Sequence, residues 1–218
     1  MRNYLEPSFA CLGGHGTFMK PWYIRVNGPN IRLGKCATVV AERDRTVSIG
    51  VWGDSEGKGE ITIGDYVMIS PGVRITAAES IVIGDSCMMA NGAFITDSDW
   101  HGVYDRVGRD DAHQPVVLED NVWIGDHAIV LKGVTVGRNS IVAAGSVVAR
   151  DVPANVVVAG SPARVVKELD EEKGFKTRAG FFSDPVGLAR EYDKIDQLVL
   201  KDNSTLGWLK RIFWPRSQ

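Results

Sequence analysis

Large aliphatic side chains return at every sixth position over most of this chain. The first series is Ile63, Ile69, Ile75 and Ile81, then, after a shift of two residues, Ile83, Met89 and Ile95. The second series is Leu118, Ile124, Val130, Val136, Val142 and Val148. The fifth position of each hexad is small with few exceptions, and the second position is often glycine. The chain is therefore built on a six-residue repeat.

A six-residue period predicts short parallel strands rather than an amphipathic helix, whose apolar positions return after three and four residues. Such strands suit a β-solenoid, in which each side stacks on its equivalent one coil later. Glycine at the second position suits a corner with positive φ. A weaker start at Leu33, Val39, Val47 and Ile49 brings the prediction to roughly five three-sided coils. The predicted fold class is all-β, a parallel β-helix.

The repeat divides the chain into three parts. Residues 31–169 form the predicted β-helix domain, residues 1–30 are a lead-in or cap, and residues 170–218 are a C-terminal extension. The spacing of apolar residues in LAREYDKIDQLVLKD predicts a helix in this extension. Residues 97–114 break the repeat, so we expect a loop extruded from the solenoid over residues 97–116. A polar, glycine-rich stretch, residues 50–60, predicts a second loop between coils.

The composition excludes several classes of protein. A net charge of −2 offers no basic surface for nucleic acid. No apolar run approaches the roughly 20 residues that span a bilayer, and the N-terminus lacks the apolar core of a signal peptide. We therefore expect a cytoplasmic protein. Cys11, Cys36 and Cys87 are odd in number and far apart, which indicates neither a disulfide framework nor a CxxC metal site.

The second series resembles a known family. Residues 121–169, NVWIGDHAIVLKGVTVGRNSIVAAGSVVARDVPANVVVAGSPARVVKEL, are similar to the hexapeptide-repeat acyltransferases, and most similar to their maltose, galactoside and xenobiotic O-acetyltransferase branch. The resemblance covers residues 30–169 and implies a left-handed parallel β-helix, whereas parallel crossovers in most proteins are right-handed. It also implies a homotrimer that uses an acyl-CoA, in the first place acetyl-CoA. The acceptor it implies is a hydroxyl of a sugar or of a cell-envelope polysaccharide precursor.

In this family a histidine on an extruded loop is the general base, and His101 matches that place. Acyl transfer needs a base for the proton of the acceptor and a donor for the oxyanion, and histidine titrates near neutral pH. Asp97 or Asp99 is the expected partner of the second imidazole nitrogen. The alternative is a solvated loop histidine. His113, at the end of the same loop, is the second candidate, and His127 is expected to face outward.

The resemblance also assigns contacts to the acyl-CoA, namely Trp123, Asp126, Ala144, Ala149, Arg150, Arg164 and Lys167. The three cations suit the phosphates of coenzyme A, and an alanine at 144 lets the pantetheine arm approach the backbone. Two positions depart from the family: Asp126 replaces a small neutral polar residue, and Ala149 replaces a threonine. An exposed Trp123 on a solenoid indicates an interface or a ligand. No metal is expected.

The acceptor site departs further from the sugar acetyltransferases. The asparagine and aspartate that hold the acceptor in that branch correspond to Ser70 and Ala78 here. Since an alanine cannot bind a hydroxyl, the candidate acceptor contacts are Ser70, Asn91 and Trp100, which precedes His101. Asn91 has a second explanation, because solenoid corners also favour asparagine.

Two other functions fit the same residues. An N-acetyltransferase acting on an amino sugar or another amine would share every donor contact. A non-catalytic solenoid would bind a partner through the C-terminal tail GWLKRIFWPRSQ, whose aromatic and basic residues also suit a membrane surface. A zinc carbonic anhydrase, a related β-helix class, is not predicted. His101, His113 and His127 lack the closely spaced pair that its three-histidine site requires.

Overall fold

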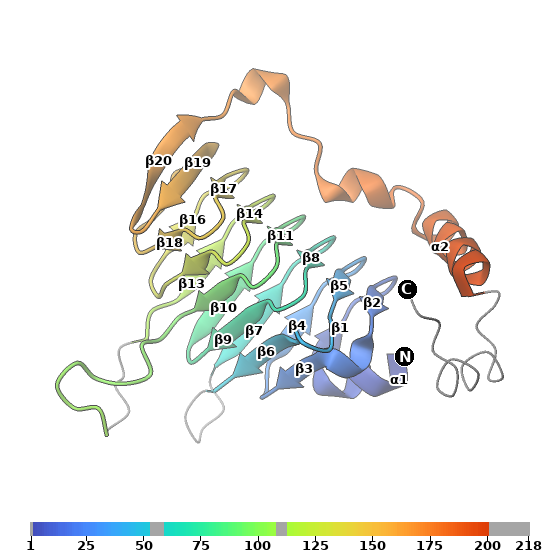
Figure 1. The fold of residues 1–218 in the computed structure, drawn as a ribbon, viewed down its shortest axis with the longest axis horizontal. Helices are drawn as coiled ribbons and strands as arrows, with labels where there is room; N and C mark the ends of the chain where they lie inside the picture. Colours follow the sequence, from blue (N-terminus) through green and yellow to red (C-terminus); the bar gives the residue numbers. More distant parts are fainter. Residues whose placement is uncertain (1, 53–58, 108–112, 201–218) are drawn as a thin grey trace, which may run out of the picture. The chain divides into compact units, whose positions relative to one another are not determined.

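The computed structural model describes residues 2–52, 59–107 and 113–200 (Figure 1). The chain divides into two compact units, Met1–Phe181 and Phe182–Gln218. The described residues of the first unit form three sheets, named A, B and C below. Sheet A consists of β1 (Cys11–Leu12), β4 (Ile31–Leu33), β7 (Glu60–Ile63), β10 (Ser80–Ile83), β13 (Val116–Leu118) and β16 (Thr135–Val136).

Sheets B and C complete the solenoid. Sheet B consists of β2 (Thr17–Met19), β5 (Thr38–Val40), β8 (Met68–Ile69), β11 (Met88–Met89), β14 (Trp123–Ile124), β17 (Ile141–Val142), β19 (Val156–Gly160) and β20 (Ala163–Glu168). Sheet C consists of β3 (Ile24–Asn27), β6 (Val47–Val51), β9 (Arg74–Ala77), β12 (Phe94–Thr96), β15 (Ile129–Val130) and β18 (Val147–Val148). All neighbouring strands are parallel except β19 and β20, which form an antiparallel hairpin.

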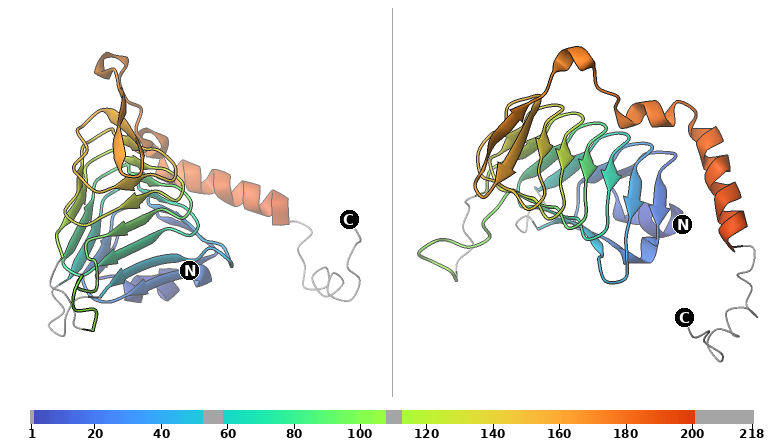
Figure 2. Two further views of the ribbon diagram at one scale, coloured as in Figure 1. Left: turned by 60° about the vertical axis from the view of Figure 1, so that its left-hand side comes forward. Right: turned by 45° about the horizontal axis from the view of Figure 1, so that its top comes forward.

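One strand from each sheet makes a coil, and the described strands form six coils, from coil 1 (β1–β3) to coil 6 (β16–β18). The coils are three-sided and stack in one direction (Figure 2). Consecutive sides meet at three corners, named AB, BC and CA after the sheets that they join. The all-β parallel helix predicted from the repeat is confirmed.

The repeated aliphatic residues fill the interior as ladders. In sheet C, for example, Ile49, Ile75, Ile95 and Val130 pair in register from coil to coil, and each is fully buried. Burial of one such side chain contributes about 1.5–3 kcal/mol. The interior is therefore the main source of stability, and it leaves the corners free to differ.

The solenoid begins earlier than the repeat indicates. Residues 1–30 are predicted as a lead-in, but β1, β2 and β3 hold the first places in the three sheets, so coil 1 already lies within this stretch. The period is hidden because the short 3₁₀ helix η2 (Pro21–Tyr23) fills one corner of this coil. Helix α1 (Arg2–Leu5) and η1 (Glu6–Ser8) precede it, and Leu5 and Phe9 are buried. The coil count is accordingly six rather than five.

Beyond the hairpin, a C-terminal strap of residues 170–181 contains η3 (Glu171–Lys173) and the start of η4 (Arg178–Phe182). The Arg178 guanidinium donates hydrogen bonds to the Tyr66 carbonyl at 2.7 Å and to Thr38 Oγ1 at 2.9 Å. The strap therefore returns to coils 2 and 3. The helix predicted in the extension is α2 (Pro185–Leu200). Across the described residues, no helix is both long and apolar enough to cross a membrane. The aromatic and basic tail lies outside the described residues.

Candidate active site

Asp97 lies at the start of the extruded loop, directly after β12, and is fully buried. Its carboxylate accepts three backbone N–H groups from the CA corner of coil 3: Ala78 at 2.7 Å, and Glu79 and Ser80 at 2.8 Å each. Burial raises the pKa of Asp97, while these hydrogen bonds and the nearby His113 act in the opposite direction. Asp97 thus holds a turn of the preceding coil, in place of the expected contact with His101.

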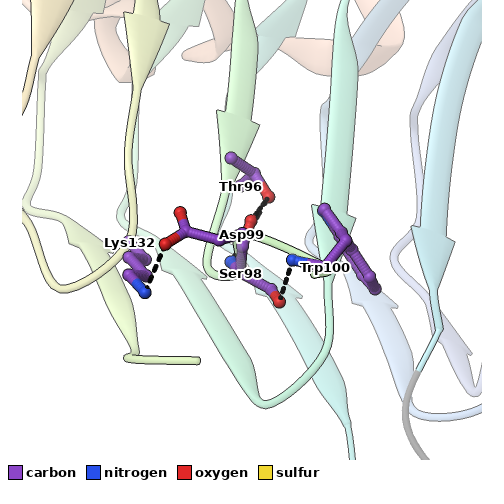
Figure 3. Close-up of polar contacts among 5 residues, drawn as sticks. All are labelled: Thr96, Ser98, Asp99, Trp100 and Lys132. Atoms are coloured by element: carbon purple, nitrogen blue, oxygen red, sulfur yellow. Dashed lines mark hydrogen bonds and ion pairs between the residues drawn. The ribbon is translucent and has the colours of Figure 1, made fainter. Parts of the chain in front are cut away.

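The next residues form a compact turn (Figure 3). Thr96 Oγ1 donates to the Ser98 carbonyl at 3.1 Å, and Ser98 Oγ accepts the Trp100 N–H at 3.0 Å. Trp100 has a φ of 66°, a left-handed conformation that is costly for a bulky side chain and indicates a backbone fixed by its surroundings. The Asp99 carboxylate forms an ion pair with Lys132 Nζ at 2.6 Å. Asp99 therefore faces coil 5, and it too is not paired with His101.

The far end of the loop is also fixed. Ser98 and His113 form an isolated antiparallel bridge. The Gln114 N–H donates to the Asp97 carbonyl at 2.9 Å, and the Gly133 N–H donates to the Gln114 carbonyl at 3.0 Å. Both ends of the loop are thus held at the CA corner, between coils 3 and 5. Residues 108–112 lie outside the described part of the chain.

His101 follows this turn and is exposed. Within the described residues its imidazole makes no hydrogen bond or ion pair, so it is accessible to an acceptor. His113, the second candidate, is half-buried at the root of the loop. His127 is exposed, as predicted, and its ring lies against Gly92: a Cβ on that glycine would stand 2.8 Å from the imidazole.

A different group of predicted residues lies along the BC corner. Ser70, Asn91, Asp126 and Ala144 follow strands β8, β11, β14 and β17, which pair in register. Asp126 and Ala144 are exposed, and the Asp126 carbonyl accepts the Gly145 N–H at 2.7 Å. A Cβ at Gly125 would approach the Ala144 nitrogen to 2.7 Å. The corner is thus narrow, and two of the three predicted acceptor residues, Ser70 and Asn91, lie at the same corner as the pantetheine residues, whereas Trp100 lies on the extruded loop at the CA corner.

The remaining predicted contacts lie towards the C-terminal end. Ala149 and Arg150 follow β18 at the CA corner, and both are exposed. Arg150 and Arg164 line the same depression of about 150 Å³, so two of the three predicted phosphate ligands come together. Lys167 is exposed on β20. Trp123 is 44% exposed on the outer face of sheet B.

The catalytic and pantetheine candidates therefore lie at opposite ends of the strands of sheet C. His101 and Arg150 belong to the CA corner, whereas Asp126 and Ala144 belong to the BC corner. In coil 5 these two corners are represented by Asp126 and Lys132, which precede and follow strand β15. The two sets therefore occupy different corners of the solenoid.

Comparison with known proteins identifies the chain. Residues 115–150 match the family model described as bacterial transferase hexapeptide (six repeats). WbbJ of Escherichia coli K12, named as an O-acetyl transferase of lipopolysaccharide biosynthesis, is 32% identical over 165 residues, which cover 70% of this chain and 78% of WbbJ. Galactoside O-acetyltransferase from the same organism is 35% identical over 167 residues, which cover 77% and 68%. The chain belongs to the hexapeptide-repeat acetyltransferases.

This acetyltransferase also has solved structural neighbours. AntD, an N-acyltransferase from Bacillus cereus, was solved as a point mutant in complex with dTDP-4-amino-4,6-dideoxyglucose and coenzyme A. It superposes with a TM-score of 0.54 at 18% identity, over 89% of this chain and 96% of AntD. At that identity the likeness concerns the fold, which is the left-handed parallel β-helix that the resemblance implies. The predicted handedness and enzyme class are both confirmed.

Sequence reasoning missed one residue of this acetyltransferase. Lys132 stands at an ordinary corner of coil 5, and a surface lysine there is usually solvated. The structure shows that this corner lies directly beside the root of the extruded loop, where the Lys132 side chain is only 23% exposed. A signal was present in the spacing, because Lys132 follows the end of the loop by one coil. In the described residues no group of three or more histidine, cysteine or acidic side chains is placed to hold a metal.

Proposed function

We propose that this acetyltransferase moves an acyl group, in the first place acetyl, from coenzyme A to a hydroxyl of a sugar or of a cell-envelope polysaccharide precursor. The observation that carries the proposal is the placement of His101: it is exposed, on a loop whose two ends are fixed to coils 3 and 5. A fixed base of this kind can meet the acceptor in a reproducible geometry, which general base catalysis requires.

In the proposed reaction the His101 imidazole removes the proton of the acceptor hydroxyl as its oxygen attacks the thioester carbonyl. The tetrahedral intermediate collapses with cleavage of the C–S bond, and the imidazolium returns the proton to the departing thiolate. A backbone N–H group would stabilise the oxyanion. Arg150, Arg164 and Lys167 would bind the phosphates of the acyl-CoA, because guanidinium and ammonium groups form charge-assisted hydrogen bonds with phosphate oxygens.

The proposed assembly is a homotrimer with each site between two subunits. The separation of the CA and BC corners supports this assembly. In one chain His101 lies at the end of the sheet C strands and Asp126 lies at their start. A second copy that presents its BC corner to the CA corner of the first would complete the site. Ser70, Asn91 and Trp100 would then stand near the acceptor. The exposed Trp123 fits the same interface or the ligand beside it.

The relatives support a sugar acceptor. WbbJ is named for lipopolysaccharide biosynthesis, and the second relative is named galactoside O-acetyltransferase. Both names describe O-acetyltransferases. AntD favours the second candidate function, because it is an N-acyltransferase that holds an amino sugar nucleotide with coenzyme A. An amine acceptor would use the same donor contacts. The proposal places O-acylation first because the relatives named as O-acetyltransferases match 70% and 77% of this chain. N-acetyltransferases of tetrahydropyridine dicarboxylate are more similar, at 56% identity, but over only 29% of this chain.

The test is acyl transfer from acetyl-CoA to a panel of neutral sugars, nucleotide sugars and amino sugars, measured as release of coenzyme A thiol. We expect His101→Ala to lower kcat by roughly 10²–10⁴-fold. His15→Asn is the matched control, because His15 lies in coil 1 with a φ of 60° that asparagine also adopts. A near wild-type rate for His101→Ala would overturn the base assignment, as would a loss seen only in His113→Gln. Acyl transfer to amines alone would show that the protein is an N-acyltransferase rather than an O-acyltransferase.

A further inference from the structure

We infer that Lys132 is a positioning residue for the catalytic loop, acting on His101 through its ion pair with Asp99. The inference rests on the proposed function in taking His101 as the base. The pair joins two coils: Asp99 belongs to the loop that leaves coil 4, and Lys132 to the CA corner of coil 5 (Figure 3). The Nζ to Oδ2 distance of 2.6 Å is that of a direct, charge-assisted hydrogen bond.

The first two acidic residues of the loop, Asp97 and Asp99, bind to the two coils on either side of coil 4. Asp97 binds the turn at Ala78 on the N-terminal side of coil 4. Asp99 binds Lys132 on the opposite side. A loop held at one of these points could swing about the other, whereas contacts to both flanking coils oppose that rotation. The direction in which the chain leaves the solenoid is therefore set by both carboxylates together.

The turn between Asp99 and His101 transmits this constraint. Trp100 is left-handed, and its N–H is bonded to Ser98 Oγ. Ser98 is itself buried, with only 5% of the residue exposed. Because consecutive Cα atoms are about 3.8 Å apart, fixing the Asp99 side chain and the Trp100 backbone leaves the His101 Cα little freedom. The pair thus acts two residues away from the imidazole.

The Asp99–Lys132 ion pair is expected to contribute little to the stability of the fold. The Asp99 side chain is 54% exposed and that of Lys132 is 23% exposed, and ion pairs of this kind contribute little to the free energy of folding because of solvent screening. Catalysis is more sensitive, because a displacement of about 1 Å at a catalytic group can lower a rate by roughly 10²-fold. The expected signature is a loss of turnover in a protein that is still folded.

The kinetic test compares Lys132→Met, Asp99→Asn and the charge exchange of both residues. We expect the two single variants to lower kcat by roughly 10–100-fold and to leave the KM for acetyl-CoA nearly unchanged. The exchange should recover part of the loss, because it restores an attraction between the same two positions. The matched control is Lys35→Met, which removes the Lys35–Asp65 ion pair of 3.4 Å between coils 2 and 3, away from the loop. Wild-type turnover in Lys132→Met, or an equal loss in Lys35→Met, would overturn the inference.

A second measurement does not depend on activity. Hydrogen–deuterium exchange over residues 96–104 should be faster in Lys132→Met than in the wild type, and unchanged in Lys35→Met. Equal exchange in Lys132→Met and wild type would refute the positioning role even if acyl transfer is confirmed. Faster exchange in a protein that transfers no acyl group would refute the proposed function and retain the loop restraint. Faster exchange with unaltered kcat would show that the pair orders the loop without positioning the base, which also overturns the inference.

Discussion

Replacement of Asp97 by alanine should be among the most destabilising single changes in the solenoid. The carboxylate accepts three backbone N–H groups at 2.7–2.8 Å and is fully buried. Hydrogen bonds to charged groups contribute about 1.5–3 kcal/mol each, and their losses are not additive. Because water can reach part of the emptied turn, we expect Asp97→Ala to lower the free energy of unfolding by about 3–5 kcal/mol. Asp97→Asn keeps the volume and one acceptor oxygen, so about 1–2 kcal/mol is expected.

Guanidinium unfolding followed by circular dichroism measures these differences, with Asp99→Ala as the matched control from the same loop. The control removes a half-exposed ion pair and should cost at most about 1 kcal/mol. In thermal unfolding Asp97→Ala should lower Tm by roughly 6–20 °C, since about 1 kcal/mol corresponds to 2–4 °C in a chain of this size. If Asp97→Ala and Asp99→Ala are equally stable, the buried carboxylate does not hold the coil 3 turn, and the reasoning fails.

Two further predictions concern a corner glycine and a buried thiol. Gly133→Ala and Gly145→Ala should each cost about 1–2 kcal/mol, because their φ values are 71° and 68°. No atom lies within 4 Å of a Cβ at Gly145, and the atom closest to a Cβ at Gly133, Gln114 Oε1 at 2.3 Å, is the end of a flexible side chain that can turn away. Similar losses are therefore expected in urea unfolding, and wild-type stability of either variant would contradict this reasoning. Burial raises the pKa of Cys87 to about 12. A disulfide reagent at pH 8 should therefore label the exposed Cys11 and leave Cys87 unmodified until the protein unfolds. Rapid labelling of Cys87 in the native protein would contradict this prediction.

The sequence was sufficient for the fold wherever one residue type recurred at a fixed interval. Ile75 and Ile95 follow the six-residue period and pair directly in sheet C. The first coil could not be found in this way, because Pro21 opens a 3₁₀ turn within it and the hexads there differ in length. Pairing with β4 and β5, rather than a local pattern, makes β1 and β2 strands of the solenoid. In coil 1 this pairing is not accompanied by a six-residue period.

The sequence indicated which residues lie near the candidate site, but not which partners their side chains bind. Asp97 and Asp99 stand close to His101 in the sequence, and that proximity favoured a contact with the imidazole. Whether a loop carboxylate turns to its own loop or to a flanking coil depends on which partner the adjacent corner offers. Here the amides of coil 3 and the ammonium group of Lys132 bind the two carboxylates. Only the three-dimensional register of coils 3 and 5 could reveal this.

The C-terminal strap changes how this solenoid should come apart. Coils that touch only their neighbours unfold as a one-dimensional array, in which terminal coils fray while the middle persists. Arg178 bonds to Thr38, 140 residues away in the sequence, and to the Tyr66 carbonyl, 112 residues away. Opening coil 2 or coil 3 therefore also releases the strap, so fraying from the N-terminal side has a higher free-energy cost than in an open array. A repeat protein closed in this manner should lose its coils in a single cooperative transition rather than in succession.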